Sequence, residues 1–316
     1  MDALKITVVS GFLGAGKTTL IKHFIQQHAF GPNPILVEND YGSLGIDSKE
    51  LSGFGVEIKD LTAGCICCSL KGDFLKAISK VLEAQQFSHV VIEPSGVGKL
   101  SDILGMLREP SFVQRFGIGS ITAITIVDAR RFKENNRYVT EYFWNQIQNS
   151  RLLLLNRTES LDNEELKEIY DILHENHISF PILNGFTPDN IDFIQTFLDT
   201  PPAPFQPMRQ MGKKRSIPGV PTKESRDNRF KFWSTAVTRS YTREQLESIL
   251  KELEDTESYG KIYRAKGIVD VDGESKLFDY VPNESEIREF ERQEEGMILV
   301  IGENLQAENL SRLFLQ

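Results

Sequence analysis

Apolar residues gather in short runs along the first 200 residues, and longer amphipathic stretches separate these runs. Nearly continuous apolar runs are typical of strands buried on both faces of a parallel sheet. Apolar positions recurring every three to four residues predict helices instead. The predicted strands are residues 5–10, 34–38, 56–60, 89–93, 120–128, 151–156 and 180–184, and the predicted helices are residues 17–28, 70–85, 97–107, 136–148, 163–176 and 188–198. This alternation predicts an α/β domain over residues 1–200, with three layers, a mostly parallel sheet and right-handed crossovers.

The pattern changes at residues 201–229, where six prolines lie among basic residues. We expect a linker there, and its cations favour a solvated segment over a docking surface for an acidic partner or nucleic acid. Residues 230–316 are rich in predicted strands, with few long crossovers, which indicates a small α+β domain. Its predicted strands are residues 230–238, 261–271, 276–281 and 297–301, and its predicted helices are residues 242–254 and 305–315.

Composition narrows the class of protein. The chain has 316 residues and a net charge of −9, so a protein built to bind nucleic acid or an anionic membrane is not expected. No apolar run is long enough to span a bilayer, and the first residues do not resemble a signal peptide. All three cysteines lie within residues 65–68, which excludes a disulfide framework and favours a reducing, cytoplasmic setting.

The first predicted strand runs directly into a glycine-rich turn and then a helix, and the turn fits the phosphate-binding pattern G-x-x-x-x-G-K-[ST]. Glycines let the backbone come close to a phosphate chain, whose charge is met by N–H groups at the helix start. Lys17 is expected to reach the β- and γ-phosphates, and the Thr18 hydroxyl to bind Mg²⁺. The predicted nucleotide-binding residues here are Gly11, Gly14, Ala15, Gly16, Lys17, Thr18 and Thr19.

Two further predicted strands end in carboxylates. Glu93 ends the fourth strand, where it is a candidate Mg²⁺ ligand and, with Lys17, a candidate catalytic residue. Gly96 follows and can offer its N–H to a γ-phosphate. Glu38 ends the second strand and is a candidate for sensing Mg²⁺ or completing a thiol site, although an ordinary acidic turn explains it equally well.

Cys65, Cys67 and Cys68 follow the third predicted strand and precede a helix. Thiolates select soft or borderline metals such as Zn²⁺. Three ligands leave a tetrahedral site open, and an open site suits ion exchange better than structure. Buried cysteines that act as small apolar side chains are the alternative. The position of this cluster at the predicted nucleotide edge of the sheet favours the metal site.

The segment Asn156-Arg157-Thr158-Glu159 resembles the guanine-reading pattern Asn-Lys-x-Asp. Asn156 can hydrogen-bond the base, the Arg157 side chain can cover its face, and Glu159 can accept from the guanine N–H groups. The longer glutamate side chain requires a shifted backbone to make the same contact, so weaker guanine selectivity is expected.

Together these motifs, in this order, resemble the CobW-like P-loop GTPases, which are related to the nickel-insertion GTPases of hydrogenase and urease maturation. The resemblance implies a GTPase with a slow basal rate that uses GTP and Mg²⁺. It further implies Zn²⁺, or alternatively Co²⁺, at the cysteine cluster, and delivery of that metal to a client protein or cofactor pathway. A nucleotide-dependent homodimer is a further candidate assembly.

The chain also departs from the family pattern. Ser43 stands where a carboxylate is frequent, and Pro94-Ser95-Gly96 replaces the more usual Thr-Thr-Gly. No histidine-rich segment is present, so local metal storage is not expected and the fourth zinc ligand stays open. Two other functions remain alternatives: a generic P-loop NTPase or kinase with structural cysteines, and a nucleotide-switched scaffold.

Overall fold

The computed structural model describes residues 3–31, 33–38, 57–60, 71–84, 87–200, 230–290 and 296–316. The chain divides into two compact units, residues 1–201 and residues 202–316. The predicted linker, residues 201–229, lies outside the described residues. No helix in the described part of the chain is long and apolar enough to cross a membrane.

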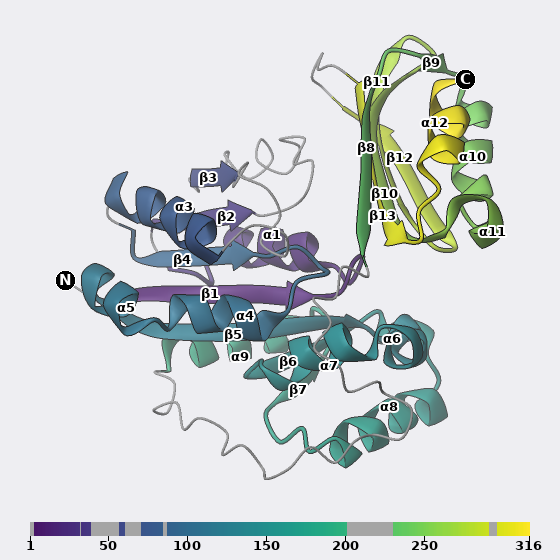
Figure 1. Ribbon diagram of the computed structural model, residues 1–316. Helices are drawn as coiled ribbons and strands as arrows, with labels where there is room; N and C mark the ends of the chain where they lie inside the picture. Colours follow the sequence, from purple (N-terminus) through teal and green to yellow (C-terminus); the bar gives the residue numbers. More distant parts are fainter. Residues whose placement is uncertain are drawn as a thin grey trace. The chain divides into compact units, whose positions relative to one another are not determined.

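The N-terminal unit is built on a sheet of seven strands in the order β3-β2-β4-β1-β5-β6-β7 (Figure 1). Every strand pair in it is parallel, as the continuous apolar runs predicted. The central position of β1 brings the glycine-rich turn to the middle of the carboxyl edge. The strands are β1 (Leu4–Gly11), β2 (Pro34–Glu38), β3 (Glu57–Asp60), β4 (His89–Glu93), β5 (Ile118–Asp128), β6 (Leu152–Asn156) and β7 (Ile182–Asn184).

Helices cover both faces of this sheet, which confirms the three layers. On one face α1 and α9 pack Leu20, Phe24 and Ile194 against sheet residues such as Val9 and Leu154. The helices of the N-terminal unit are α1 (Lys17–Gln26), α3 (Lys71–Ala84), α4 (Leu100–Leu107), α5 (Pro110–Phe116), α6 (Phe132–Tyr138), α7 (Thr140–Gln148), α8 (Asn163–Glu175) and α9 (Pro188–Asp199).

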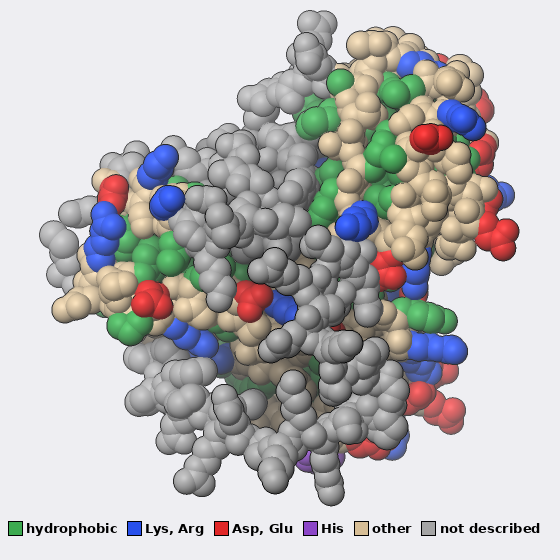
Figure 2. All heavy atoms as spheres, in the orientation of Figure 1, with side chains coloured by type: hydrophobic (Ala, Val, Ile, Leu, Met, Phe, Trp, Pro, Cys, Tyr) green, Lys and Arg blue, Asp and Glu red, His purple; other side chains and the backbone are tan. Residues whose placement is uncertain are grey.

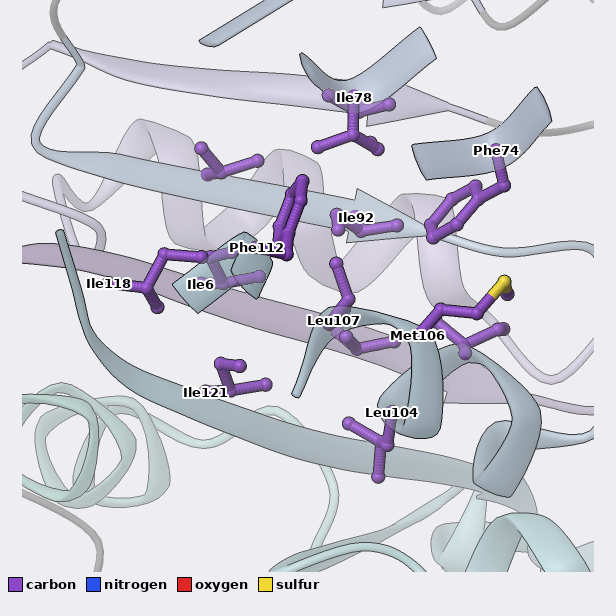
Figure 3. Packing of buried hydrophobic residues seen from close by; sticks show 14 of the residues in the cluster. Ile6, Phe74, Ile78, Ile92, Leu104, Met106, Leu107, Phe112, Ile118 and Ile121 are labelled. Atoms are coloured by element: carbon purple, nitrogen blue, oxygen red, sulfur yellow. The ribbon is translucent and has the colours of Figure 1, made fainter. Parts of the chain in front are cut away.

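The opposite face carries α3, α4 and α5. Figure 3 shows Phe74 of α3, Leu107 of α4 and Phe112 of α5 around Ile92 of β4, and all four belong to one buried cluster. Burial of these apolar side chains is the main favourable contribution to the folding free energy of the unit. The two apolar faces leave the strand ends as the place where polar groups gather.

The structure corrects two helix predictions in this unit and adds a helix, α5. Residues 136–148 form two helices, α6 and α7, because Val139 leaves the helical region at φ −123°. The helix predicted from residue 97 begins at Leu100, since the preceding residues form a loop. Helix α5 was not predicted, although Pro110 at its first turn and left-handed Gly117 at its end are usual helix boundaries.

The C-terminal unit is a six-stranded sheet with helices on one face. The path β12-β11-β10-β13-β8 is antiparallel, and β9 joins β10 in parallel. Strand β12 was not predicted because its sequence, ESEIRE, is mostly polar. The elements are β8 (Lys231–Val237), β9 (Ser240–Tyr241), α10 (Arg243–Glu252), α11 (Thr256–Tyr259), β10 (Lys261–Val271), β11 (Glu274–Val281), β12 (Glu284–Glu289), β13 (Gly296–Glu303) and α12 (Ala307–Leu315).

Candidate functional site

Strand register gathers the predicted site residues at the carboxyl edge of the parallel sheet. Glu38 of β2 is directly opposite Glu93 of β4, and β4 lies next to β1, which leads into the glycine-rich turn. On the other side of β1, Asp128 of β5 is opposite Asn156 of β6. Ligands in open α/β sheets bind at this edge. Two groups of polar side chains therefore flank the turn.

The turn has the backbone that phosphate binding requires. Gly14 and Gly16 have φ of +74° and +101°, a region that side-chain-bearing residues rarely adopt. Helix α1 begins at once after Gly16, with no side-chain cap and no acidic residue in its first turn. Its N–H groups thus present partial positive charge to an anion. Lys17 is buried and donates from Nζ to the Phe12 carbonyl at 3.4 Å, so its cation lies over the turn.

Thr18, Glu93 and Glu38 form an oxygen-rich group beside the turn. The Thr18 hydroxyl donates to Glu93 Oε1 at 3.0 Å. Glu38 and Glu93 are both buried and occupy opposed positions on neighbouring strands, which run about 4.8 Å apart. Two buried carboxylates at opposed positions of neighbouring strands favour a bound cation, because desolvated like charges destabilise each other. Hard oxygen ligands of this kind fit Mg²⁺.

The loop after Glu93 packs closely on the glycine-rich turn. A Cβ atom on Gly96 would lie 2.7 Å from the Leu13 backbone nitrogen, so no other residue fits there without displacement. Ser95 is buried, and its hydroxyl has no hydrogen-bond partner among the described residues. The loop thus brings a buried hydroxyl and a backbone segment to the phosphate end of the site.

Asn156 contacts the turn directly. Its Nδ2 donates to the Ala15 carbonyl at 3.0 Å, and its Oδ1 accepts from the Arg157 N–H at 2.9 Å. A Cβ atom on Gly16 would lie 2.6 Å from Asn156 Nδ2, which explains the glycine. The strand that carries the predicted base-reading segment is therefore joined to the phosphate-binding turn.

Arg157 lies differently from the sequence expectation. Its guanidinium donates to Asp128 Oδ2 at 2.8 Å, and Arg130 donates to the same carboxylate at 3.0 Å. Glu159 is exposed on a single 3₁₀ turn, Thr158–Ser160. The described edge thus places Asn156 against the turn, directs Arg157 towards Asp128 and leaves Glu159 facing solvent.

Two residues of the candidate site, Asp128 and Gln146, were not predicted from the sequence. Asp128 ends a strand just as Glu93 and Asn156 do, so the strand-end rule could have found it. Gln146 of α7, which bonds the loop after Glu93, has no local signal, because the contact joins residues about 50 positions apart.

The cysteine cluster, Cys65, Cys67 and Cys68, lies outside the described residues. Within the part of the chain that is described, no three His, Cys, Asp or Glu side chains group as a metal site. A groove of about 470 Å³ lies between α3 and α5, and none of the predicted site residues lines it. Figure 2 shows charged and apolar side chains exposed together over these two helices, at the left of the view.

Comparison with known proteins identifies both units. Residues 5–183 match the family described as "CobW/HypB/UreG, nucleotide-binding domain", and residues 230–316 match "Cobalamin synthesis protein cobW C-terminal domain". The first match covers more than half of the chain.

Similar curated proteins bear zinc and GTPase names. The chain is 31% identical over 191 residues to "Zinc chaperone CobW" of Sinorhizobium sp, covering 52% of this chain and 54% of that protein. It is 32% identical over 136 residues to "Zinc chaperone YjiA" of Escherichia coli, covering 41% and 42%. It is 22% identical over 305 residues to "Zinc-regulated GTPase metalloprotein activator 1" of Dictyostelium discoideum, covering 84% and 62%.

The chain thus spans about half the length of the first two of these relatives. Among solved structures, Zn(II)-bound YjiA GTPase from E. coli aligns over 99% of this chain and 98% of that one, with 19% identity and a TM-score of 0.42. The matches over residues 5–183 and 230–316 place the chain in the CobW/HypB/UreG family of nucleotide-binding proteins.

Proposed function

We propose that this protein binds GTP, hydrolyses it slowly and uses the cycle to deliver zinc to a client protein. The observation that carries the proposal is the group formed by Thr18, Glu93 and Glu38 beside the glycine-rich turn. It supplies a cation site at the place where a nucleotide's phosphates meet the N-terminus of α1. Family membership and the zinc-chaperone names of relatives support the metal part.

At the phosphate end, the chain's own groups position and neutralise the reacting phosphates. Gly11, Gly14, Gly16 and the first N–H groups of α1 cradle the chain of phosphates, and Lys17 contributes its cation. Thr18 and Glu93 would hold Mg²⁺, with Glu38 close by; bound there, the ion neutralises charge that develops on the phosphates. The hydroxyl of Ser95 and the N–H of Gly96 lie on the loop at the same end.

At the base end, Asn156 and Glu159 are proposed to select guanine. Asn156 Nδ2 already donates one hydrogen to Ala15, which fixes the amide beside the turn and leaves its second hydrogen for the base. Glu159 is exposed and can turn to accept from guanine N–H groups. Because its side chain is longer than aspartate, we expect a preference for GTP over ATP that is modest in size.

At the metal end, Cys65, Cys67 and Cys68 are proposed as zinc ligands, with Co²⁺ as the alternative ion. Chain connectivity limits the distance: Cys65 lies five positions after Asp60, the end of β3, and five Cα–Cα steps span at most about 18 Å. Asp60 is opposite Glu38 in the sheet register. Because Asp60 ends β3 at this edge, Glu38 is a candidate fourth ligand for zinc bound by these thiols.

A paired assay tests this function. Lys17→Ala should weaken GTP binding about ten- to a hundredfold, because charge-assisted hydrogen bonds to the phosphates are lost. Lys22→Ala, on the same helix, is the matched control. Cys67→Ser should lower Zn²⁺ affinity, measured against a chromophoric chelator, while GTP binding is retained.

Each alternative has its own outcome. Equal Zn²⁺ affinity in Cys67→Ser and the parent protein would remove the metal role. A clear preference for ATP would favour a generic P-loop NTPase or kinase. Nucleotide-dependent partner binding without hydrolysis, even with Zn²⁺ and Mg²⁺ present, would favour a switched scaffold. Light scattering with a GTP analogue and with GDP tests the nucleotide-dependent homodimer.

A further inference from the structure

The loop of residues 94–99, which follows Glu93, is held between two parts of the N-terminal unit. On one side Gly96 lies against Leu13 of the glycine-rich turn, with no room for a Cβ atom. On the other side lies α7. The loop closes on itself as well, because the Gly98 N–H donates to the Ser95 carbonyl at 3.0 Å. A short loop fixed at so many points has one defined position.

Gln146 of α7 makes the contacts on the second side. Its Nε2 donates to the Gly96 carbonyl at 3.0 Å and to the Gly98 carbonyl at 3.1 Å. The side chain is 1% exposed, so water does not compete for these bonds. One buried amide therefore satisfies two carbonyls of the same turn.

Gln146 is itself fixed to the sheet. Its backbone carbonyl accepts from the Thr125 hydroxyl at 2.8 Å, and Thr125 is a fully buried residue of β5. The amide thus links the loop to a rigid strand through a single residue. Loss of the side chain would leave this anchor in place and remove only the contact to the loop.

The neighbouring residues of α7 continue the contact. The Ser101 N–H donates to Asn145 Oδ1 at 3.1 Å, and Asn145 Nδ2 donates to the Ser101 hydroxyl at 2.9 Å. Lys99 pairs with Glu141, one turn earlier on the helix. One face of α7 therefore follows the chain from Gly96 to the start of α4.

These bonds also orient the backbone N–H groups of the loop. In a trans peptide the carbonyl and the next residue's N–H point in opposite directions. Because the carbonyls of Gly96 and Gly98 point at Gln146, the N–H groups of Val97 and Lys99 point away from α7. Gln146 thus decides which polar groups of the loop are available to the phosphate end of the site.

We propose that Gln146 is a positioning residue of the nucleotide site, which holds the loop after Glu93 in the orientation that senses the terminal phosphate. It does so through the carbonyls of Gly96 and Gly98 and does not touch the nucleotide itself. The proposal rests on the proposed nucleotide function and adds a residue from a distant helix to it.

The test compares a GTP analogue that cannot be hydrolysed with GDP. In Gln146→Leu, two buried carbonyls lose their donor, so the loop should leave its position. We expect binding of the fluorescent GTP analogue to weaken about tenfold, GDP binding to change less than about twofold, and kcat for GTP hydrolysis to fall about tenfold. Equal changes for both nucleotides, or no change for either, would overturn the proposal.

Two control variants separate positioning from general loss of structure. Gln148→Leu changes an exposed glutamine two residues later on α7 and should leave both affinities as in the parent. Thr125→Val removes the bond that anchors Gln146's backbone without touching the loop contacts. It should lower the melting temperature and keep the ratio of the two affinities. The same ratio change in Thr125→Val as in Gln146→Leu would contradict the proposal.

A measurement on the parent protein covers the case in which Gln146→Leu does not fold. Hydrogen exchange of residues 95–101 should be slower with the GTP analogue than with GDP, while residues 152–156 exchange alike in both. Equal exchange of residues 95–101 would overturn the proposal. If the parent binds nucleotide but hydrolyses none, the hydrolysis part of the proposed function fails, and the affinity ratio still tests Gln146.

Discussion

The two compact units bury different kinds of side chain. In the C-terminal unit the described core is formed by residues such as Val237, Leu246, Phe278 and Phe314, and the buried side chains there are hydrophobic. In the N-terminal unit, apolar clusters on both faces of the sheet are accompanied by buried polar and charged groups. Those described are Thr7, Ser10, Lys17, Glu38, His89, Glu93, Ser95, Thr122, Thr125, Asp128, Asn135, Gln146 and Ser150.

Many of these polar groups lie at or near the carboxyl edge of the parallel sheet. A buried polar group destabilises a fold unless a partner compensates for its lost hydration. In the N-terminal unit these buried polar groups lower the free energy of unfolding at the place where a nucleotide and a cation would bind. The stability of this unit should therefore depend on ligands and pH. The described core of the C-terminal unit is hydrophobic, so its stability should depend mainly on packing. Against the raising effect of burial, the charge and hydrogen bonds of Arg264 lower the pKa of Asp279, which adds a loss of stability in acid.

The largest effect is expected from a cavity in the C-terminal core. Phe278 and Phe314 are fully buried and stack with ring centroids 6.2 Å apart. Phe278→Ala should reduce the unfolding free energy of this unit by about 3–5 kcal/mol. Hydrogen exchange read by mass spectrometry should show the loss in residues 230–316, with nucleotide binding retained.

The control for this variant is Phe193→Ala, which truncates an aromatic side chain that is 42% exposed on α9. This substitution should lower the unfolding free energy far less than Phe278→Ala does. If Phe278→Ala reduced protection equally in the strands of residues 4–156, the two units would not be separate in stability.

The next effect comes from pH. Burial, followed by the nearby Lys5 charge, lowers the pKa of His89 from 6.5 to about 4, against raising effects from Phe30 and Asp199. The ring is hydrogen-bonded to Thr7 at 2.8 Å. Below pH 6.5 the imidazole of His89 binds a proton in the unfolded chain, whereas in the folded unit it binds one only near pH 4. Stability of the N-terminal unit should therefore fall by about 3 kcal/mol across that window on acidification.

Denaturant titrations between pH 7 and pH 4, followed by exchange in each unit, measure this slope. In His89→Asn the part of the slope due to this ring should disappear, whereas exposed His174→Asn should keep it. An unchanged slope in His89→Asn would show that burial of the imidazole does not link folding to protonation.

A smaller effect is expected at Asp128. Its side chain is 3% exposed and pairs with Arg130 and Arg157, whose side chains are 38% and 30% exposed. Asp128→Asn removes the charge and keeps an oxygen for the Arg130 N–H. Because both arginines can turn to solvent, the unfolding free energy should fall by about 2 kcal/mol, which is less than for a wholly buried pair.

Nucleotide binding should weaken with it, since Arg157 adjoins Asn156. Isothermal calorimetry and chemical denaturation report the two effects. Asp171→Asn, which breaks an exposed pair with Lys167, is the control and should change neither quantity. Unchanged stability in Asp128→Asn would show that the ion pairs of Asp128 with Arg130 and Arg157 do not stabilise this edge of the sheet.

The smallest effects are expected from equivalent helix caps, one in each unit. Asp162 caps α8 and Thr242 caps α10, each in a capping box with the residue three positions later. Asp162→Ala and Thr242→Ala should each cost about 1 kcal/mol, each in its own unit. Unit-specific exchange distinguishes them, and a loss that spread to the other unit would show coupling between the units.

Much of the framework was determined by the sequence alone. Continuous apolar runs predicted the parallel strands, because both faces of such a sheet are covered by helices. The turn from Gly11 to Thr18 and the strand end at Glu93 were local patterns. In each case the physical cause acts within a few residues, so the sequence records it directly.

Tertiary structure decided what depends on distant neighbours. Strand β12 pairs at the edge of its sheet although its residues are mostly polar, because β11 supplies the backbone partners. Register placed Glu38 opposite Glu93 and turned Arg157 towards Asp128. Gln146 reached the loop after Glu93 only because α7 packs there. Hydrogen bonds between segments depend on how helices and strands pack, and no local pattern of residues encodes that packing.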